Sequence, residues 1–134
     1  MASEVITEEQ ISEWVREQFQ RANKHLAEKG VLFESVVTEE SRYLAPHVAV
    51  WKIKSIEGQY FWVITGDVPA DVIPYKSEKT AQDTLRAFSM RWHLQAENIL
   101  QSNTNDQIQK DFANMLIIKA EKMYELFANE GNWQ

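Results

Sequence analysis

The spacing of apolar residues changes twice along this chain of 134 residues, and that change limits the possible folds more than any other feature. Residues 8–29 place apolar side chains at helical spacing, residues 31–65 are rich in β-branched and aromatic residues, and residues 79–129 return to helical spacing. Helical spacing builds one apolar stripe, whereas strand spacing builds a sheet with two faces. The sequence therefore predicts an α+β fold of order α-β-β-β-α-α: an N-terminal helix, a three-stranded antiparallel sheet and two C-terminal helices packed on one face.

The N-terminal helix has a defined start and end in the sequence. Thr7 and Gln10 stand three residues apart, which is the spacing of a capping box. Gly30 supplies a residue type that commonly ends a helix in a left-handed conformation. One apolar stripe lies between them, formed by Ile11, Trp14, Val15, Phe19, Ala22 and Leu26.

Three segments of the middle region predict strands: Val31–Thr38, Val48–Ile56 and Gln59–Thr65. The last two flank Glu57-Gly58, which suits a two-residue hairpin turn. That turn predicts one face toward the helices, made of Ala49, Trp51, Ile53, Tyr60, Trp62 and Ile64. Lys52 is then expected on the reverse, partly wet face.

Two helices are expected after the sheet. The first runs from about Lys79 to Gln101, with Ser77 or Thr80 as its cap, and the second from about Asp106 to Asn129. No repeat, low-complexity stretch or linker divides the sequence, so we expect a single α+β domain over residues 1–134.

Composition excludes several classes of function. Twenty acidic residues against 14 basic ones give a net charge of −6, and no run of Lys and Arg provides a surface for nucleic acid. The absence of cysteine excludes disulfides and thiolate chemistry, and it fits a reducing compartment. The chain shows neither a leader pattern at its start nor an apolar run of about 20 residues. We therefore expect a cytoplasmic protein without membrane or nucleic-acid partners.

Two segments carry a family resemblance: Phe61–Asp71, which contains Gly-Asp-x-Pro-x-Asp, and the helical segment Leu85–Ala96. Together with the N-terminal helix and the tryptophan-bearing hairpin, they resemble a family of small bacterial proteins known only as a domain of unknown function. The resemblance spans most of the chain. It implies no activity, substrate or cofactor, but it marks the loop and the helix after it as the recognisable part of the family.

The segment Gly66–Pro74 is the first candidate site. Two prolines and a glycine within nine residues preclude a regular helix or a central strand. Asp67 and Asp71 could bind a small polar ligand together with Arg86, Arg91 and His93. Asx turns explain such loop aspartates more simply, however, and a calcium site would need more oxygen ligands at regular spacing. We therefore treat these five residues as a candidate ligand site and predict no metal.

Signatures of catalysis are missing. The histidines at positions 25, 47 and 93 never stand four residues apart, so the two-histidine zinc motif is absent. Ser89 lacks the sequence of a nucleophile elbow, although His93 follows it on the same expected helix. No glycine-rich phosphate loop occurs, so no cofactor is predicted. The sequence nominates no catalytic residue and leaves open whether the protein is an enzyme.

The last two helices are too apolar to bury only one stripe each. Met90 and Leu94 lie away from the main stripe of the first, and Ile117 and Tyr124 widen the stripe of the second. Trp133 follows the last helix, where its ring must fold back or meet another chain. These five residues are the candidate partner interface, and a two-fold homodimer would bury them.

The leading interpretation is a non-catalytic binding or protein-interaction module that forms a homodimer and uses the Gly66–Pro74 loop and the adjacent helix surface. The alternative is an enzyme of unrecognised type, or a small-ligand binder, with its site at that loop and the following helix. His47 or His93 would complete such a site. A third possibility is an accessory or immunity-type protein that neutralises a basic partner through its acidic charge.

Overall fold

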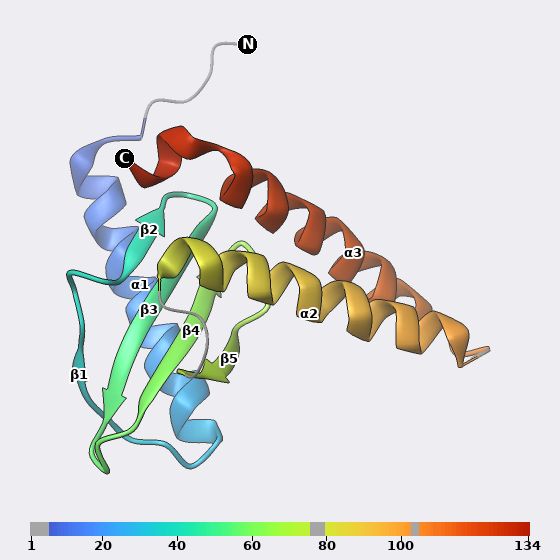
Figure 1. The fold of residues 1–134 in the computed structure, drawn as a ribbon, viewed down its shortest axis with the longest axis horizontal. Helices are drawn as coiled ribbons and strands as arrows, with labels where there is room; N and C mark the ends of the chain where they lie inside the picture. The colour runs from blue at the N-terminus through green and yellow to red at the C-terminus, as the bar shows by residue number, and fades with distance from the viewer. Residues whose placement is uncertain (1–5, 76–79, 103–104) are drawn as a thin grey trace. The chain divides into compact units, whose positions relative to one another are not determined.

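The computed structural model describes residues 6–75, 80–102 and 105–134 (Figure 1). These residues form two compact units, Met1–Ser77 and Glu78–Gln134, here called the sheet unit and the helical unit. The sheet unit contains α1 (Glu8–Glu28), β1 (Phe33–Val36), β2 (Arg42–Leu44), β3 (Val48–Ser55), β4 (Tyr60–Gly66) and β5 (Asp71–Pro74). The helical unit contains α2 (Ala81–Gln101), α3 (Gln107–Ala128) and the 3₁₀ helix η1 (Glu130–Trp133).

The sheet has five antiparallel strands, so the prediction of three was wrong although the order of the predicted elements was right. The order is β1-β3-β4-β5, and β2 pairs with β3 beyond the end of β1. At three residues, β2 is too short to show a period in the sequence. The other unpredicted strand, β5, lies within the proline-containing segment. It is an edge strand, where Pro74 costs no ladder hydrogen bond, so a central strand is indeed absent there.

Helix α1 lies across one face of the sheet (Figure 1). Its predicted capping box is confirmed: the backbone N–H of Gln10 donates to Thr7 Oγ1 at 3.1 Å, and the Thr7 N–H donates to Gln10 Oε1 at 3.0 Å. Its buried residues Ala22 and Leu26 pack with the buried strand residues Ala49, Trp51, Ile53 and Val63. These residues form the core of the sheet unit, which packs α1 against β3 and β4.

The β3–β4 hairpin differs by one residue from the predicted register. The Ser55 N–H donates to the Gln59 carbonyl at 2.8 Å, which leaves a three-residue loop ending in Gly58 at φ +86° rather than a two-residue turn. A slip of one residue moves a strand's side chains to the opposite face. As a result Trp51 lies opposite Val63, and Trp62 lies opposite Lys52 on the other face. The prediction that Trp51 and Trp62 share a face was therefore wrong.

In the helical unit, α2 and α3 lie side by side as an antiparallel hairpin (Figure 1). Thr80 caps α2, as predicted, by accepting from the Asp83 N–H at 3.1 Å; Ser77, the other predicted cap, lies outside the described residues. The buried face of α3 is formed by Ala113, Leu116, Ala120 and Met123. Small residues at such positions let two helix backbones come close together.

No helix in the described part of the chain is long and apolar enough to cross a membrane. The α+β class is confirmed. The packing of both C-terminal helices on one face of the sheet, and the single domain over residues 1–134, stay predictions.

Candidate functional site

The Gly66–Pro74 segment is held to α1 by a residue that the sequence did not single out. Arg21 Nη1 donates to the Gly66 carbonyl at 2.6 Å, and Arg21 Nη2 donates to the Val68 carbonyl at 3.3 Å. Gln18 Oε1 accepts from the same Nη1 at 2.9 Å and helps to orient the guanidinium. An arginine does meet this loop, but it comes from the N-terminal helix and binds backbone carbonyls.

Gly66 occupies a position that no other residue fits. Its φ is +125°, and a Cβ built there would lie 2.5 Å from the His47 carbonyl oxygen and 2.7 Å from the Val48 Cα. The next residue continues this close approach, because the Asp67 N–H donates to the same His47 oxygen at 2.9 Å. The end of β4 is therefore fixed on one side by the start of β3 and on the other by Arg21.

The two aspartates of the candidate site have different surroundings. Asp67 is exposed, whereas Asp71 is half-buried and accepts from the Val72 N–H through Oδ1 at 2.8 Å. Asp71 therefore binds a backbone N–H, as expected of a loop aspartate, but that of the next residue at the start of β5 and not the one two residues on that defines an Asx turn. Among the described residues, no three His, Asp or Glu side chains are grouped as ligands for a metal ion.

His25 lies near the same segment, at the end of α1. Burial is the main cause that lowers its pKa below the usual value, the positive charge of Lys29 adds to this effect, and Asp71 opposes it. Its Nε2 is buried and accepts no hydrogen bond from the described part of the chain. Nothing in the sequence favours this histidine over the other two.

Lys52 occupies an aromatic cage on the other face of the sheet. Its ammonium nitrogen lies 4.2 Å from the ring centroid of Tyr75, 5.2 Å from that of Tyr60 and 6.0 Å from that of Trp62. Both carboxylate oxygens of Glu40 accept from it at 3.1 Å. Lys52 is only 7% exposed, so its charge is neutralised and stabilised inside the unit. The expectation of a wet face for this lysine was wrong.

The remaining candidate ligand residues belong to α2. Arg86, Arg91 and His93 are all exposed in the helical unit, whereas Asp67 and Asp71 belong to the sheet unit. Within the sheet unit, the structure joins the backbone of Asp67 to that of His47, and Asp71 lies close enough to His25 to raise its pKa. Convergence of the five predicted residues on one ligand stays a prediction.

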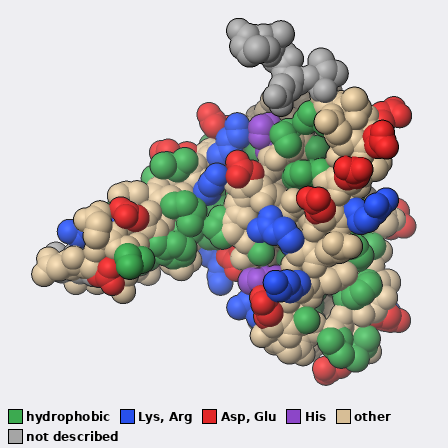
Figure 2. All heavy atoms as spheres, turned by 180° about the vertical axis from the view of Figure 1, so that it is seen from behind, with side chains coloured by type: hydrophobic (Ala, Val, Ile, Leu, Met, Phe, Trp, Pro, Cys, Tyr) green, Lys and Arg blue, Asp and Glu red, His purple; other side chains and the backbone are tan. Residues whose placement is uncertain are grey.

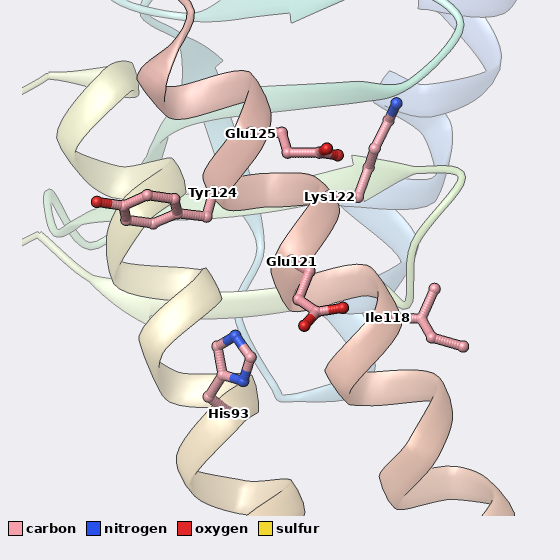
Figure 3. Close-up of a pocket in the computed structure, with 6 residues that line it drawn as sticks. All are labelled: His93, Ile118, Glu121, Lys122, Tyr124 and Glu125. Carbon is pink, nitrogen blue, oxygen red and sulfur yellow. The ribbon is translucent and has the colours of Figure 1, made fainter.

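His93 borders an open hollow of about 550 Å³ on the helical unit (Figure 3). His93 is the lining residue from α2. The lining residues from α3 are Ile118, Glu121, Lys122, Tyr124 and Glu125. Figure 3 shows the Glu121 side chain extending toward His93, while Ile118 lies on the other side of α3. The lining residues diverge around a helix instead of facing a common point, so the hollow does not assemble a reaction centre.

Ser89 is used in helix packing. It is buried, and its Oγ donates to the Ala120 carbonyl of α3 at 2.7 Å. A nucleophile needs an accessible oxygen and a neighbouring base. The structure therefore gives Ser89 a packing role and no part in a Ser-His pair.

The five candidate interface residues differ in exposure. Met90 and Leu94 of α2 are 55% and 60% exposed, and Tyr124 of α3 is exposed as well. Ile117 is half-buried. Trp133 is also half-buried and folds back, because its indole Nε1 donates to the Leu126 carbonyl at 3.1 Å and to the Phe127 carbonyl at 3.2 Å. Of the two options for Trp133, folding back is the one observed.

Comparison with known proteins identifies a family and no relative of known activity. A family model described as "Domain of unknown function (DUF4826)" matches residues 8–133. This match confirms the resemblance to a domain of unknown function over most of the chain. No curated protein and no solved structure matches the chain.

Proposed function

The chain belongs to the DUF4826 family of domains of unknown function, and we propose that it is a non-catalytic interaction module that forms a homodimer through its helical unit. The observation that carries this proposal is the exposure of Met90 and Leu94 on consecutive turns of α2, at 55% and 60%. Both lie near the middle of a 21-residue helix, where regular backbone holds their side chains on one face.

The distribution of exposed apolar residues favours the helical unit as the contact. Figure 2 shows apolar side chains along the hairpin, at left, next to acidic and basic ones. The sheet unit also exposes apolar side chains: Leu32 and Ile56 lie outside its strands and helices, and the less exposed Phe33, Tyr43 and Tyr60 lie on strands. A helix holds its exposed side chains in a fixed arrangement, so less ordering is needed when it binds.

Three polar side chains support a non-catalytic role because their groups serve the fold. Ser89 binds a backbone carbonyl, Asp71 binds a backbone N–H, and Lys52 is paired with Glu40. A catalytic group must be able to reach a reacting atom. The net charge of −6 and the absence of cysteine favour a protein contact over nucleic acid, in a reducing compartment such as the cytoplasm.

The dimer is expected to be weak, because the apolar part of the contact is small and consists of Met90 and Leu94 from each copy. We therefore expect a reversible equilibrium between monomer and dimer that depends on protein concentration.

Sedimentation equilibrium on the full chain from about 5 to about 500 µM tests the proposal. The wild type should change from one-chain to two-chain mass, and Leu94→Lys should remain a monomer because a charge would replace the apolar contact. Ile56→Lys is the matched control, since Ile56 is also 60% exposed, and it should dimerise like the wild type. A wild-type monomer throughout this range would overturn the proposal, as would equal dimerisation of Leu94→Lys and wild type.

A further inference from the structure

The charges around Met90 and Leu94 form a pattern that is complementary to itself. Arg86 lies one turn before Met90, and Glu97 lies one turn after Leu94. Both charged residues are exposed. The apolar pair is therefore flanked by a cation toward the start of α2 and by an anion toward its end.

This pattern favours one orientation of two copies. Consider two α2 helices that pack antiparallel in a register centred at the level of residue 92. In this register Met90 of one copy lies opposite Leu94 of the other. Arg86 then falls beside Glu97 of the other copy, and the two-fold axis repeats that pair. A parallel arrangement would instead place Arg86 against Arg86 and Glu97 against Glu97, which repel.

From this complementarity we infer that the partner of the α2 face is a second copy of this chain, bound antiparallel with Arg86 of each copy paired to Glu97 of the other. The inference rests on the proposed function and adds the orientation and the charged pairs. The other residues on this face are compatible with the antiparallel arrangement. The small side chain of Ala87 leaves room for Glu97 of the other copy. Asp83 of one copy lies opposite Gln101 of the other, and both residues are exposed.

A charge exchange tests the pairing. Arg86→Glu and Glu97→Arg, each made alone, turn two attractive contacts per dimer into repulsive ones, and each should weaken the dimer about tenfold. The double variant R86E/E97R restores both pairs with reversed polarity, and its dissociation constant should return to within about threefold of wild type. Arg16→Glu and Glu13→Arg on α1 match the changes in net charge and should leave the dimer as it is.

Disulfide trapping tests the orientation separately. Because the chain has no cysteine, Met90→Cys and Leu94→Cys each introduce a single thiol. Under mild oxidation, a mixture of the two variants should give mainly the mixed 90–94 disulfide. Predominant 90–90 and 94–94 products would show a parallel arrangement and overturn the inference.

The outcomes distinguish the inferred antiparallel pairing from the proposed homodimer. A wild-type protein that stays monomeric rejects both. A dimer that Leu94→Lys disrupts, but whose stability neither single charge variant changes, keeps the dimer and removes the charged pairs. A double variant as weak as the singles also rejects the pairing.

Discussion

The two units of the molecule use their side chains in opposite ways. In the sheet unit, long polar side chains make contacts within the fold: Lys52 is buried in an aromatic cage, and Arg21, although exposed, donates to the carbonyls of Gly66 and Val68. In the helical unit, Met90 and Leu94 are apolar and turn outward. Interior polar contacts stabilise a fold, whereas exposed apolar side chains gain free energy only when something covers them. Substitutions in the sheet unit should therefore change stability, and substitutions on the outer face of α2 should change association.

The largest loss of stability is expected for Gly66→Ala. The new Cβ would meet the His47 carbonyl, and alanine is strained at a φ of +125°. We expect the free energy of unfolding to fall by about 2–4 kcal/mol, measured by urea denaturation. Gly58→Ala is the control: its φ is +86° but no atom lies within 4 Å of its Cβ, so about 1 kcal/mol is expected. Equal losses would show that close approach at Gly66 is unimportant.

The second-largest loss of stability is expected for Lys52→Met. Methionine keeps most of the stem and removes the ammonium, which ends the pairing with Glu40 and the contacts with three rings. The expected loss is about 1–2 kcal/mol. Lys54→Met removes an exposed pair with Glu34 at 3.7 Å and should cost less than about 0.5 kcal/mol. If both substitutions cost the same in urea denaturation, the cage contributes nothing beyond a surface ion pair.

Ser89→Ala examines the interior of the helical unit. It removes the hydrogen bond to the Ala120 carbonyl, and we expect a loss of about 1 kcal/mol in thermal or urea unfolding. The dissociation constant of the dimer should not change, because Ser89 is buried against α3 whereas Met90 is exposed. A weakened dimer with unchanged stability would contradict the division between packing residues and contact residues.

The smallest expected effect is the contribution of His25 to the pH dependence of folding stability. Its pKa is lowered in the folded chain, chiefly by burial, so the unfolded chain binds a proton more readily. This histidine's contribution to stability is complete above its unfolded pKa of about 6.5 and declines as pH falls through the lowered folded value. His25→Gln should reduce the slope of melting temperature against pH between about pH 7 and pH 5. An unchanged slope would show that His25 does not couple folding to pH.

Part of the candidate site could be predicted from the sequence. The glycine and the prolines of Gly66–Pro74 identified a segment that is neither a helix nor a central strand. Asp71 accepts a local hydrogen bond from a backbone N–H, although from the next residue and not in the expected Asx turn. Arg21 could not be found in this way, because it binds Gly66 across 45 residues of sequence. Nothing in the spacing of α1 distinguishes Arg21 from an arginine that contacts only solvent.

The sequence by itself determined the features that depend on neighbours three or four residues away. The capping box of Thr7 and the cap at Thr80 belong to this class, as do the α+β order of elements and the exposure of Met90 and Leu94. Such features arise from local hydrogen bonds and from the period of the helix.

Only the tertiary structure decided the register of the hairpin and the surroundings of Lys52. One extra residue in the loop after Ser55 moved Trp62 to the face of Lys52, and this turned an expected surface lysine into the centre of an aromatic cage. The period of a strand is two residues, so both registers satisfy the same alternating pattern. The choice between them depends on loop geometry and on which side chains the rest of the unit covers.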